Sequence, residues 1–184
     1  MKQKEIVGIG PVLFKQSERA KYIRVIVQSS SNIVVIVPKG ISFQQAEEFV
    51  KSKKAWIKKH QSKLQLLEQN YTASAVDRRK AKALLQKRLN QLSREYSLPY
   101  NKLTIRNQKT RWGSCSCKNN ISLNYKLVLL PEELLDYVLV HELVHTKIKN
   151  HGTRYWSKLD SLIGYARTKD MRLKQYRFLL STDE

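Results

Sequence analysis

Two short apolar segments near the N-terminus have the composition of β-strands. Residues 21–27 (KYIRVIV) and 33–38 (IVVIVP) are rich in β-branched side chains, and the polar stretch 28–32 separates them. Branched side chains fit the pleated surface of a sheet, and a polar stretch between two such segments favours a turn. The pattern predicts a β-hairpin that ends at the Pro-Lys-Gly sequence of residues 38–40.

Apolar residues spaced three and four apart predict two helices after the hairpin. The first helix opens with a capping-box pair, Ser42 and Gln45, and its apolar positions continue to about Leu67. After a polar stretch, a second series runs from Ala81 to Tyr96. Both series are amphipathic, so each predicted helix packs one face on a core.

The C-terminal half contains two further apolar segments and a third helix. Residues 103–107 (LTIRN) are a predicted strand, residues 110–120 (TRWGSCSCKNN) a loop, and residues 121–127 (ISLNYKL) a strand. In the last of these, apolar and polar residues alternate strictly, which indicates one buried face. A proline followed by two glutamates is a good helix start, so a helix is predicted from Pro131 to roughly Lys147.

Three of the chain's four histidines fall within the segment HELVHTKIKNH. His141 and His145 are four residues apart on the predicted helix, so both imidazoles project from one face and can share one metal ion. Glu142 completes the H-E-x-x-H pattern, in which the histidines hold zinc and the glutamate handles the proton of a water molecule. A catalytic zinc site has three protein ligands and one open position. His151, after a polar break in the helix, is the predicted third ligand.

The two cysteines offer a second set of soft ligands. Cys115 and Cys117 stand too close in sequence for a comfortable structural crosslink, and the chain has no other cysteine, so reduced thiols in a cytosol are expected. A C-x-C pair without a second pair is a weak metal motif. We therefore expect zinc on the three histidines, and we interpret His60 as an ordinary polar side chain.

The wider sequence resembles the YgjP-like metallopeptidase domain family. The H-E-x-x-H motif and His151 are accompanied by further motifs in that family's order, and the N-terminal hairpin and the helix around Trp56 are similar as well. These motifs are Thr110-Arg111-Trp112-Gly113-Ser114-Cys115-Ser116, Ile121-Ser122-Leu123-Asn124, Leu130-Pro131, Asp136-Tyr137-Val138 and Tyr155-Trp156. The resemblance covers nearly the whole chain. Metzincins, by contrast, carry glycine three residues after the second histidine, where this chain has Ile148.

The resemblance implies a zincin-like α+β fold, preceded by the N-terminal β-hairpin and the basic helices. A short mixed sheet packs on the H-E-x-x-H helix in this fold, and residues 121–127 are the expected edge strand along the cleft. A length of 184 residues suits one domain. We predict a single YgjP-like metallopeptidase domain over residues 1–184, with the hairpin and first helix in 1–71 and the zincin-like catalytic part in 72–184. The family is related to the WLM and SprT-type proteases, which digest proteins crosslinked to DNA.

The expected activity is that of a zinc metallopeptidase. Zinc lowers the pKa of its water, and Glu142 accepts the proton as general base and later protonates the leaving amine. Ser114 and Asn124 are candidates for binding the substrate backbone, with structural hydrogen bonding as the equal alternative. Tyr155 is a candidate hydrogen-bond donor near the site, although packing below the site is the favoured interpretation of this ring.

The charge of the chain predicts that it associates with polyanions. It carries 35 Lys and Arg against 15 Asp and Glu, a formal net charge of +20, and such a field attracts nucleic acid or anionic lipid. Residues 44–94 hold 13 basic and 4 acidic residues, which form either an ordinary solvated surface or a stripe that faces phosphates. The candidate nucleic-acid contacts are Lys51, Lys54, Lys58, Arg78, Arg79 and Lys82.

Two other functions stay open at this point. One is a nucleic-acid-binding module with a structural zinc, which would need Cys115 or Cys117 as a fourth ligand. The other is a metal hydrolase of non-peptide substrates, for which Glu142 would serve equally as base. The N-terminus lacks the apolar core of a signal peptide, and no run is long enough to span a membrane. A cytoplasmic protein is therefore expected.

Overall fold

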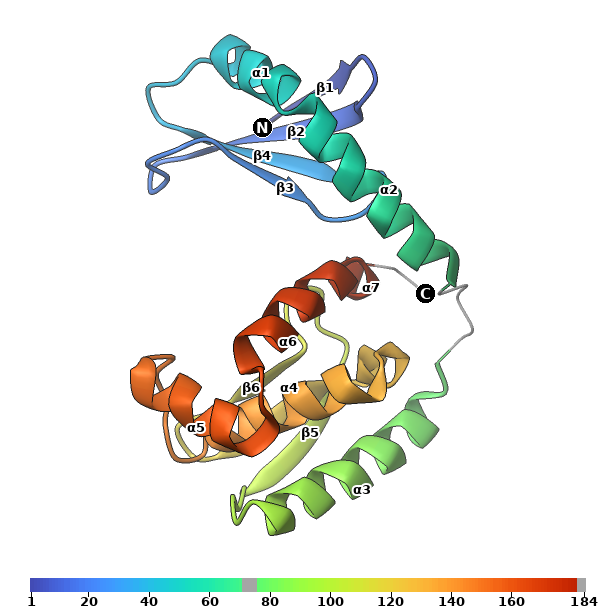
Figure 1. Cartoon of the computed structure of the whole chain (residues 1–184), viewed down its shortest axis with the longest axis vertical. Coiled ribbons are helices and arrows are strands. Elements are labelled where there is room, and N and C mark those ends of the chain that lie inside the picture. The colour runs from blue at the N-terminus through green and yellow to red at the C-terminus, as the bar shows by residue number, and fades with distance from the viewer. Residues whose placement is uncertain (71–75, 182–184) are drawn as a thin grey trace. The chain divides into compact units, whose positions relative to one another are not determined.

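The chain divides into two compact units, Met1–Thr72 and Ala73–Glu184, each with its own sheet (Figure 1). The computed structural model describes residues 1–70 and 76–181. Its mixture of helices and strands confirms the predicted α+β class. The predicted boundary after residue 71 lies outside the described residues, and a single domain over the whole chain stays a prediction. No helix in the described ranges combines the length and apolar character that a bilayer span requires.

The first unit contains a four-stranded sheet with the order β1-β2-β4-β3. Its strands are β1 (Lys2–Ile6), β2 (Gly10–Ser17), β3 (Arg24–Val27) and β4 (Ile33–Pro38). The antiparallel pairing of β3 with β4 confirms the predicted hairpin, and β2 runs parallel to β4 on the other side. The sequence pattern did not reveal β1, because Ile6 is its single buried residue and the strand shows no apolar alternation.

Two helices, α1 (Phe43–Ser52) and α2 (Lys54–Asn70), pack on one face of this sheet (Figure 1). The predicted capping box is present, since the Ser42 hydroxyl accepts from the Gln45 N–H and the Gln45 side chain accepts from the Ser42 N–H. The predicted single helix is wrong, because the chain leaves helical geometry at Lys53. Val50 and Ile57 are both buried across the break, so the apolar spacing continues and does not reveal it.

The second unit contains a three-stranded mixed sheet with the order β5-β7-β6. Its strands are β5 (Lys102–Arg106), β6 (Gly113–Cys115) and β7 (Asn120–Asn124). Strand β7 pairs parallel with β5 and antiparallel with β6. The prediction that residues 121–127 form the edge strand is therefore wrong, because β7 is the central strand. The edge is β6, which lies inside the segment predicted to be a loop.

Strand β7 is also shorter than predicted. The Asn124 side chain accepts from the Lys126 N–H, and this local bond turns the chain into a short 3-10 helix, η1 (Tyr125–Leu129). Lys126, placed on the solvent face by the predicted alternation, is buried in η1. The apolar alternation through Leu127 therefore spans two different elements.

Helix α4 (Glu132–Val144) is the central helix of the second unit (Figure 1). It packs against β6, η1 and three helices. The other helices of this unit are α3 (Arg78–Glu95), α5 (Thr153–Ile163), α6 (Ala166–Leu173), η2 (Lys174–Tyr176) and α7 (Phe178–Ser181). The predicted helices of residues 81–96 and 131–147 are thus confirmed as α3 and α4, and the packing of a short mixed sheet on the H-E-x-x-H helix is confirmed by the contact of β6 with α4.

Candidate metal centre

Helix α4, which contains His141 and is followed directly by His145, is buried on nearly all sides. Two carboxylates, Glu132 and Glu133, occupy its first turn, where they stabilise the positive end of the helix dipole. The following turns are apolar, and its buried residues are Leu134, Leu135, Tyr137, Val138, Leu139, Val140, Glu142, Leu143 and Val144. A helix that is apolar all round is fixed by its neighbours, so side chains near its C-terminal end are held in defined positions.

The three histidines of the H-E-x-x-H segment converge on one point. The Nε2 atom of His151 lies 3.0 Å from Nε2 of His145 and 3.1 Å from Nε2 of His141. Nitrogen ligands of a tetrahedral zinc, with Zn–N distances of about 2.0–2.1 Å, are separated by roughly 3.3–3.4 Å. The residues therefore fit a metal ion. Among the described residues, these histidines form the one group of three or more metal-ligating side chains close enough to share an ion.

The turn after α4 brings His151 back to the helix. Helical geometry ends at Val144, and the N–H groups of Lys147 and Ile148 both bond to its carbonyl. His145 Nδ1 lies 2.9 Å from the Ile148 carbonyl oxygen, an acceptor that holds the proton on Nδ1 and leaves the Nε2 lone pair for a metal. Lys147, in the same turn, is exposed to solvent.

A second hydrogen-bonding chain reaches His141. Its Nδ1 lies 3.5 Å from the Tyr137 hydroxyl, which donates to Asp170 of α6 at 3.3 Å. Burial and the two neighbouring histidines lower the pKa of His141 to about 3, so the ring is neutral near pH 7. A neutral imidazole is the form that binds a metal.

The floor of the site is Tyr155, a fully buried residue of α5. Its ring stacks on His145, with centroids 4.5 Å apart and planes at 23°, and it contacts the rings of His141 and His151 edge-on. Its hydroxyl donates to the His141 main-chain oxygen at 3.1 Å. Tyr155 thus packs below the histidines, in agreement with the favoured interpretation of this ring, and its hydroxyl donor is already engaged.

Glu142 is buried beside the histidines and faces the edge strand. A Cβ atom built on Gly113 of β6 would lie 2.7 Å from Glu142 Oε1 and 2.8 Å from Cγ, so only glycine leaves room for the carboxylate at this position. Burial raises the pKa of Glu142 to about 8, against a lowering effect of Arg111. A carboxyl group whose pKa lies near the working pH is suited to accept and return a proton.

These groups line a cleft of about 280 Å³. Its lining residues are Gly113, Ser114, Cys115, His141, Glu142, His145, Lys149 and His151. Lys149 links the turn after α4 to the turn between β6 and β7, because its ammonium group donates to the Ser116 carbonyl at 2.9 Å and to the Asn119 side chain at 2.7 Å. Ser114, a predicted substrate-binding residue, is one of the side chains that form the cleft wall.

Asn124, the other predicted backbone-binding residue, has a structural position. Its side chain is fully buried, donates to the Gln108 carbonyl at 2.7 Å and accepts from the Lys126 N–H at 3.1 Å. Its amide nitrogen also lies 3.5 Å from the Arg111 carbonyl. These bonds hold the segment that leads into β6, which supports the structural alternative for Asn124, and substrate binding by this side chain stays a prediction.

The two cysteines and His60 are not part of the metal-ligating group that the described residues form. Cys115 lines the cleft, but burial raises the pKa of its thiol, and Cys117 is exposed. His60 lies on α2, where its Nδ1 contacts the Trp56 carbonyl at 2.9 Å, in agreement with its interpretation as an ordinary side chain. Neither cysteine belongs to the metal-ligating group that the described residues form.

The six basic candidates fall on both units. Lys51, Lys54 and Lys58 belong to α1 and α2, whereas Arg78, Arg79 and Lys82 belong to α3. Lys51 pairs with Glu47 at 2.9 Å, Lys54 is half-buried, and the Arg78 guanidinium lies 5.0 Å from the centroid of the Tyr125 ring. Lys58, Arg79 and Lys82 are exposed.

Sequence reasoning missed several residues that shape the centre. Gly113 leaves space for Glu142, Arg111 lies close enough to affect its pKa, and Tyr137 with Asp170 reaches His141. Gly113 and Tyr137 stand in the motifs that carry the family resemblance, which was the available signal. Asp170 lies 33 residues from Tyr137 in sequence, and no local pattern connects them.

A family model matches most of the chain, and two solved structures are similar over about half of it. The family model described as YgjP-like, metallopeptidase domain, matches residues 21–80 and 68–176. The crystal structure of the metallopeptidase zymogen of Pyrococcus abyssi abylysin is similar over 50% of this chain and 93% of that one, with 22% identity and a TM-score of 0.45. For the zymogen of Methanocaldococcus jannaschii jannalysin, the values are 52%, 96%, 28% and 0.44. The search of curated proteins finds no match.

Proposed function

The chain belongs to the YgjP-like metallopeptidase domain family, and from this premise we propose that it hydrolyses peptide bonds with a zinc ion on His141, His145 and His151. The observation that carries the proposal is the convergence of three Nε2 atoms at 3.0 and 3.1 Å. Zinc favours nitrogen and sulfur ligands, and catalytic zinc sites keep a position open for water or substrate. The thiols of Cys115 and Cys117 lie outside the group, which supports an open site over a closed structural one.

Glu142 is the proposed general base. A zinc ion bound at the centre would lower the pKa of a water molecule and polarise the substrate carbonyl. The Glu142 carboxylate accepts the proton as the peptide carbonyl is attacked and then returns it to the leaving amine. The burial that raises the pKa of Glu142 to about 8 strengthens its affinity for that proton and excludes competing solvent.

The proposed substrate is a peptide in extended conformation. Within the described part of the chain, β6 has a sheet neighbour on one side only, which is β7. Extended peptides bind exposed strand edges through main-chain hydrogen bonds. Ser114, in the middle of β6 and in the cleft wall, is the side chain placed to add a further bond to the substrate backbone.

The experiment that tests this mechanism is the substitution Glu142→Gln. The variant keeps the three histidines and the shape of the carboxyl group, so zinc content measured by mass spectrometry should equal that of the wild type. Hydrolysis of an unfolded protein such as reduced casein should fall by about 10²–10⁴-fold, the usual contribution of a general base. Glu132→Gln, an exposed carboxylate in the first turn of the same helix, is the matched control and should remain active. Activity of the Glu142 variant near the wild-type value would contradict the mechanism.

We also propose that exposed cations bring the enzyme to nucleic acid and thus to nucleic-acid-associated proteins. The support is the exposure of Lys58 on α2 and of Arg79 and Lys82 on α3, none of which pairs with a carboxylate among the described residues. Long flexible cations of this kind contact phosphates without selecting a sequence. Each unit presents its own basic helix, so either surface can be tested separately.

A further inference from the structure

One arginine is held in a fixed position beside the metal centre. The Arg167 guanidinium of α6 lies 3.9 Å from the centroid of the Trp156 ring of α5, and this ring lies 6.2 Å from the ring of His151. A guanidinium stacked on an aromatic face loses little further freedom on binding, and its edge N–H groups remain directed outward for a carboxylate. The Trp156 ring is therefore close both to the Arg167 cation and to the ring of His151, the third histidine of the centre.

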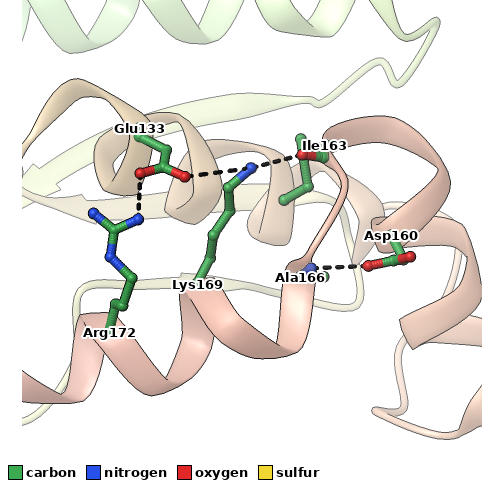
Figure 2. A network of polar contacts seen from close by, with 6 residues as sticks. All are labelled: Glu133, Asp160, Ile163, Ala166, Lys169 and Arg172. Carbon is green, nitrogen blue, oxygen red and sulfur yellow. Dashed lines mark hydrogen bonds and ion pairs between the residues drawn. The ribbon is translucent and has the colours of Figure 1, made fainter.

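The helix that carries Arg167 is fixed by a polar network, shown in Figure 2. Glu133 of α4 accepts from Arg172 at 2.5 Å and pairs with Lys169 at 3.8 Å. Lys169 also donates to the Ile163 carbonyl at 2.6 Å, and Asp160 accepts from the Ala166 N–H at 2.8 Å. The network ties α6 to α4 and to the end of α5, so the helix that carries Arg167 is held firmly against the element that carries the metal centre.

Unlike Lys169, Arg172 and Lys174, Arg167 has no acidic partner among the described residues. Arg172, Lys169 and Lys174 all pair with carboxylates. Over residues 1–70 and 76–181, no carboxylate forms an ion pair with Arg167, whose side chain is exposed. The stacking on Trp156 thus holds a charge that the protein itself does not neutralise.

Around the rest of the cleft, the described cations outnumber the carboxylates. Of the described residues that line it, Glu142 alone has a carboxylate, and Lys149 contributes an ammonium group. Arg111, two residues before the edge strand, is an exposed cation. Two acids of α4 are paired with other cations, Glu133 with Lys169 and Arg172, and Asp136 with Arg88. Lys149, Arg111 and Arg167 outnumber the one carboxylate of the lining, and an excess of positive charge raises the local concentration of anionic groups.

We propose that the cleft selects peptide segments with an acidic side chain beside the scissile bond, and that Arg167, stacked on Trp156, binds this carboxylate on the His151 side. This inference rests on the proposed peptidase function and names its substrate class. The cleft, at about 280 Å³, has the size of a side-chain site and not of a nucleic-acid duplex. One fixed guanidinium also matches one carboxylate better than a row of phosphates.

The test begins with a randomised library of ten-residue synthetic peptides, digested by the zinc-loaded wild-type protein. Mass spectrometry of the products should show Asp and Glu enriched at one position next to the cleaved bond. A matched pair of peptides, identical except for Glu or Gln at that position, then gives a ratio of kcat/KM values. We expect a ratio of about fivefold, the size of one exposed ion pair, and it should shrink as salt rises.

The variants locate the preference. Arg167→Gln should bring the Glu/Gln ratio close to one, and Arg167→Lys should retain part of it, because lysine keeps the charge but lacks the planar fork. Lys158→Gln, an exposed cation on α5 two residues after Trp156, removes the same charge elsewhere and should leave the ratio unchanged. The ratio is measured within one enzyme preparation, so a partly unfolded fraction cancels. In a Glu142→Gln background, fluorescence anisotropy of the labelled peptides should give the same order of affinities without turnover.

The outcomes separate this inference from the proposed function. Cleavage without enrichment of acidic residues, or an Arg167→Gln variant with the wild-type ratio, overturns the inference and leaves the peptidase intact. A wild-type protein that cleaves no peptide while retaining its zinc overturns both. A ratio lost equally in Arg167→Gln and Lys158→Gln shows a general field in place of a defined contact, and also overturns the role of Arg167.

Discussion

Gly113 and Glu142 are in such close contact that the glycine has no space for a side chain. A Cβ atom on Gly113 would fall 2.7 Å from Oε1 of the carboxylate. The edge strand and the catalytic helix are thus joined at the proposed base, and a change in the strand alters the position of the carboxylate.

The substitution Gly113→Ala should displace Glu142 without touching a metal ligand. We expect hydrolysis to fall at least ~100-fold, as for loss of the base itself, while zinc content stays at the wild-type value. Gly152→Ala is the control, since a Cβ at that glycine meets no atom within 4 Å. Full activity in Gly113→Ala would show that the carboxylate tolerates a shift, contrary to its proposed role.

The substitution His151→Ala should weaken metal binding as severely as His145→Ala. Both remove one of three converging nitrogens, and a lost ligand should cost more than the 10–100-fold known for residues that only support ligands. Competition with a chromogenic chelator measures the affinity, and His60→Ala controls for loss of a histidine as such. Unchanged affinity in His151→Ala would require a different third ligand.

Serine replacements of the two cysteines test whether the zinc site keeps an open coordination position or has a sulfur atom as fourth ligand. Cys115→Ser and Cys117→Ser should retain stoichiometric zinc, because neither thiol belongs to the converging group and three histidines suffice for a catalytic site. Metal analysis of the purified variants is the measurement. Loss of zinc from either variant would support a fourth sulfur ligand.

The substitution Asn124→Ala should lower the free energy of unfolding and leave the affinity for substrate nearly unchanged. The buried amide bonds to the Gln108 carbonyl and the Lys126 N–H, and leaving such groups unsatisfied costs about 1–3 kcal/mol each. Urea unfolding followed by circular dichroism gives the free energy, with the exposed Asn150→Ala as control. A variant of normal stability but raised KM would restore the substrate-binding interpretation.

Neutralising the exposed cations Lys58, Arg79 and Lys82 should weaken DNA binding. Each lost phosphate contact reduces the slope of log affinity against log salt by about 0.9 on duplex DNA, and exposed substitutions leave folding nearly unchanged. Titration of a labelled duplex at several salt concentrations measures the slope. Glutamine at Arg19, Lys21 and Lys118, all exposed, removes the same charge elsewhere and should affect binding less. Equal effects of the two triple variants would indicate that Lys58, Arg79 and Lys82 belong to an ordinary solvated surface.

The parts of the fold with strong local signals were predictable. The hairpin, α3, α4 and the capping box at Ser42 follow from patterns within a few residues of one another. The break at Lys53 was not predictable, because Val50 and Ile57 keep the same spacing across it. The extent of β7 was also missed, since an Asn124 side-chain bond ends the strand while the apolar alternation continues.

The candidate site also has a part that local patterns predict and a part that depends on packing between distant segments. The three converging histidines and Glu142 lie within eleven residues, so their spacing along the predicted helix was informative. The order of the strands depends on pairings between segments far apart in the chain, and residues 121–127 were therefore placed at the edge that β6 occupies. The approach of Gly113 to Glu142 and of Arg167 to Trp156 likewise depends on packing between elements.

The short segment from His141 to His151 has a consequence for folding. A metal that joins these side chains closes a loop of about ten residues, and the entropy lost in closing so short a loop is small. Binding of the ion then adds RT ln(1 + [M]/Kd) to the stability of the closed turn, about 2.7 kcal/mol at a hundredfold excess over Kd. The ion therefore acts as a removable crosslink between α4 and α5. Amide hydrogens in the turn between these helices would exchange faster after chelation, while those of β4, in the other unit, would keep their rates.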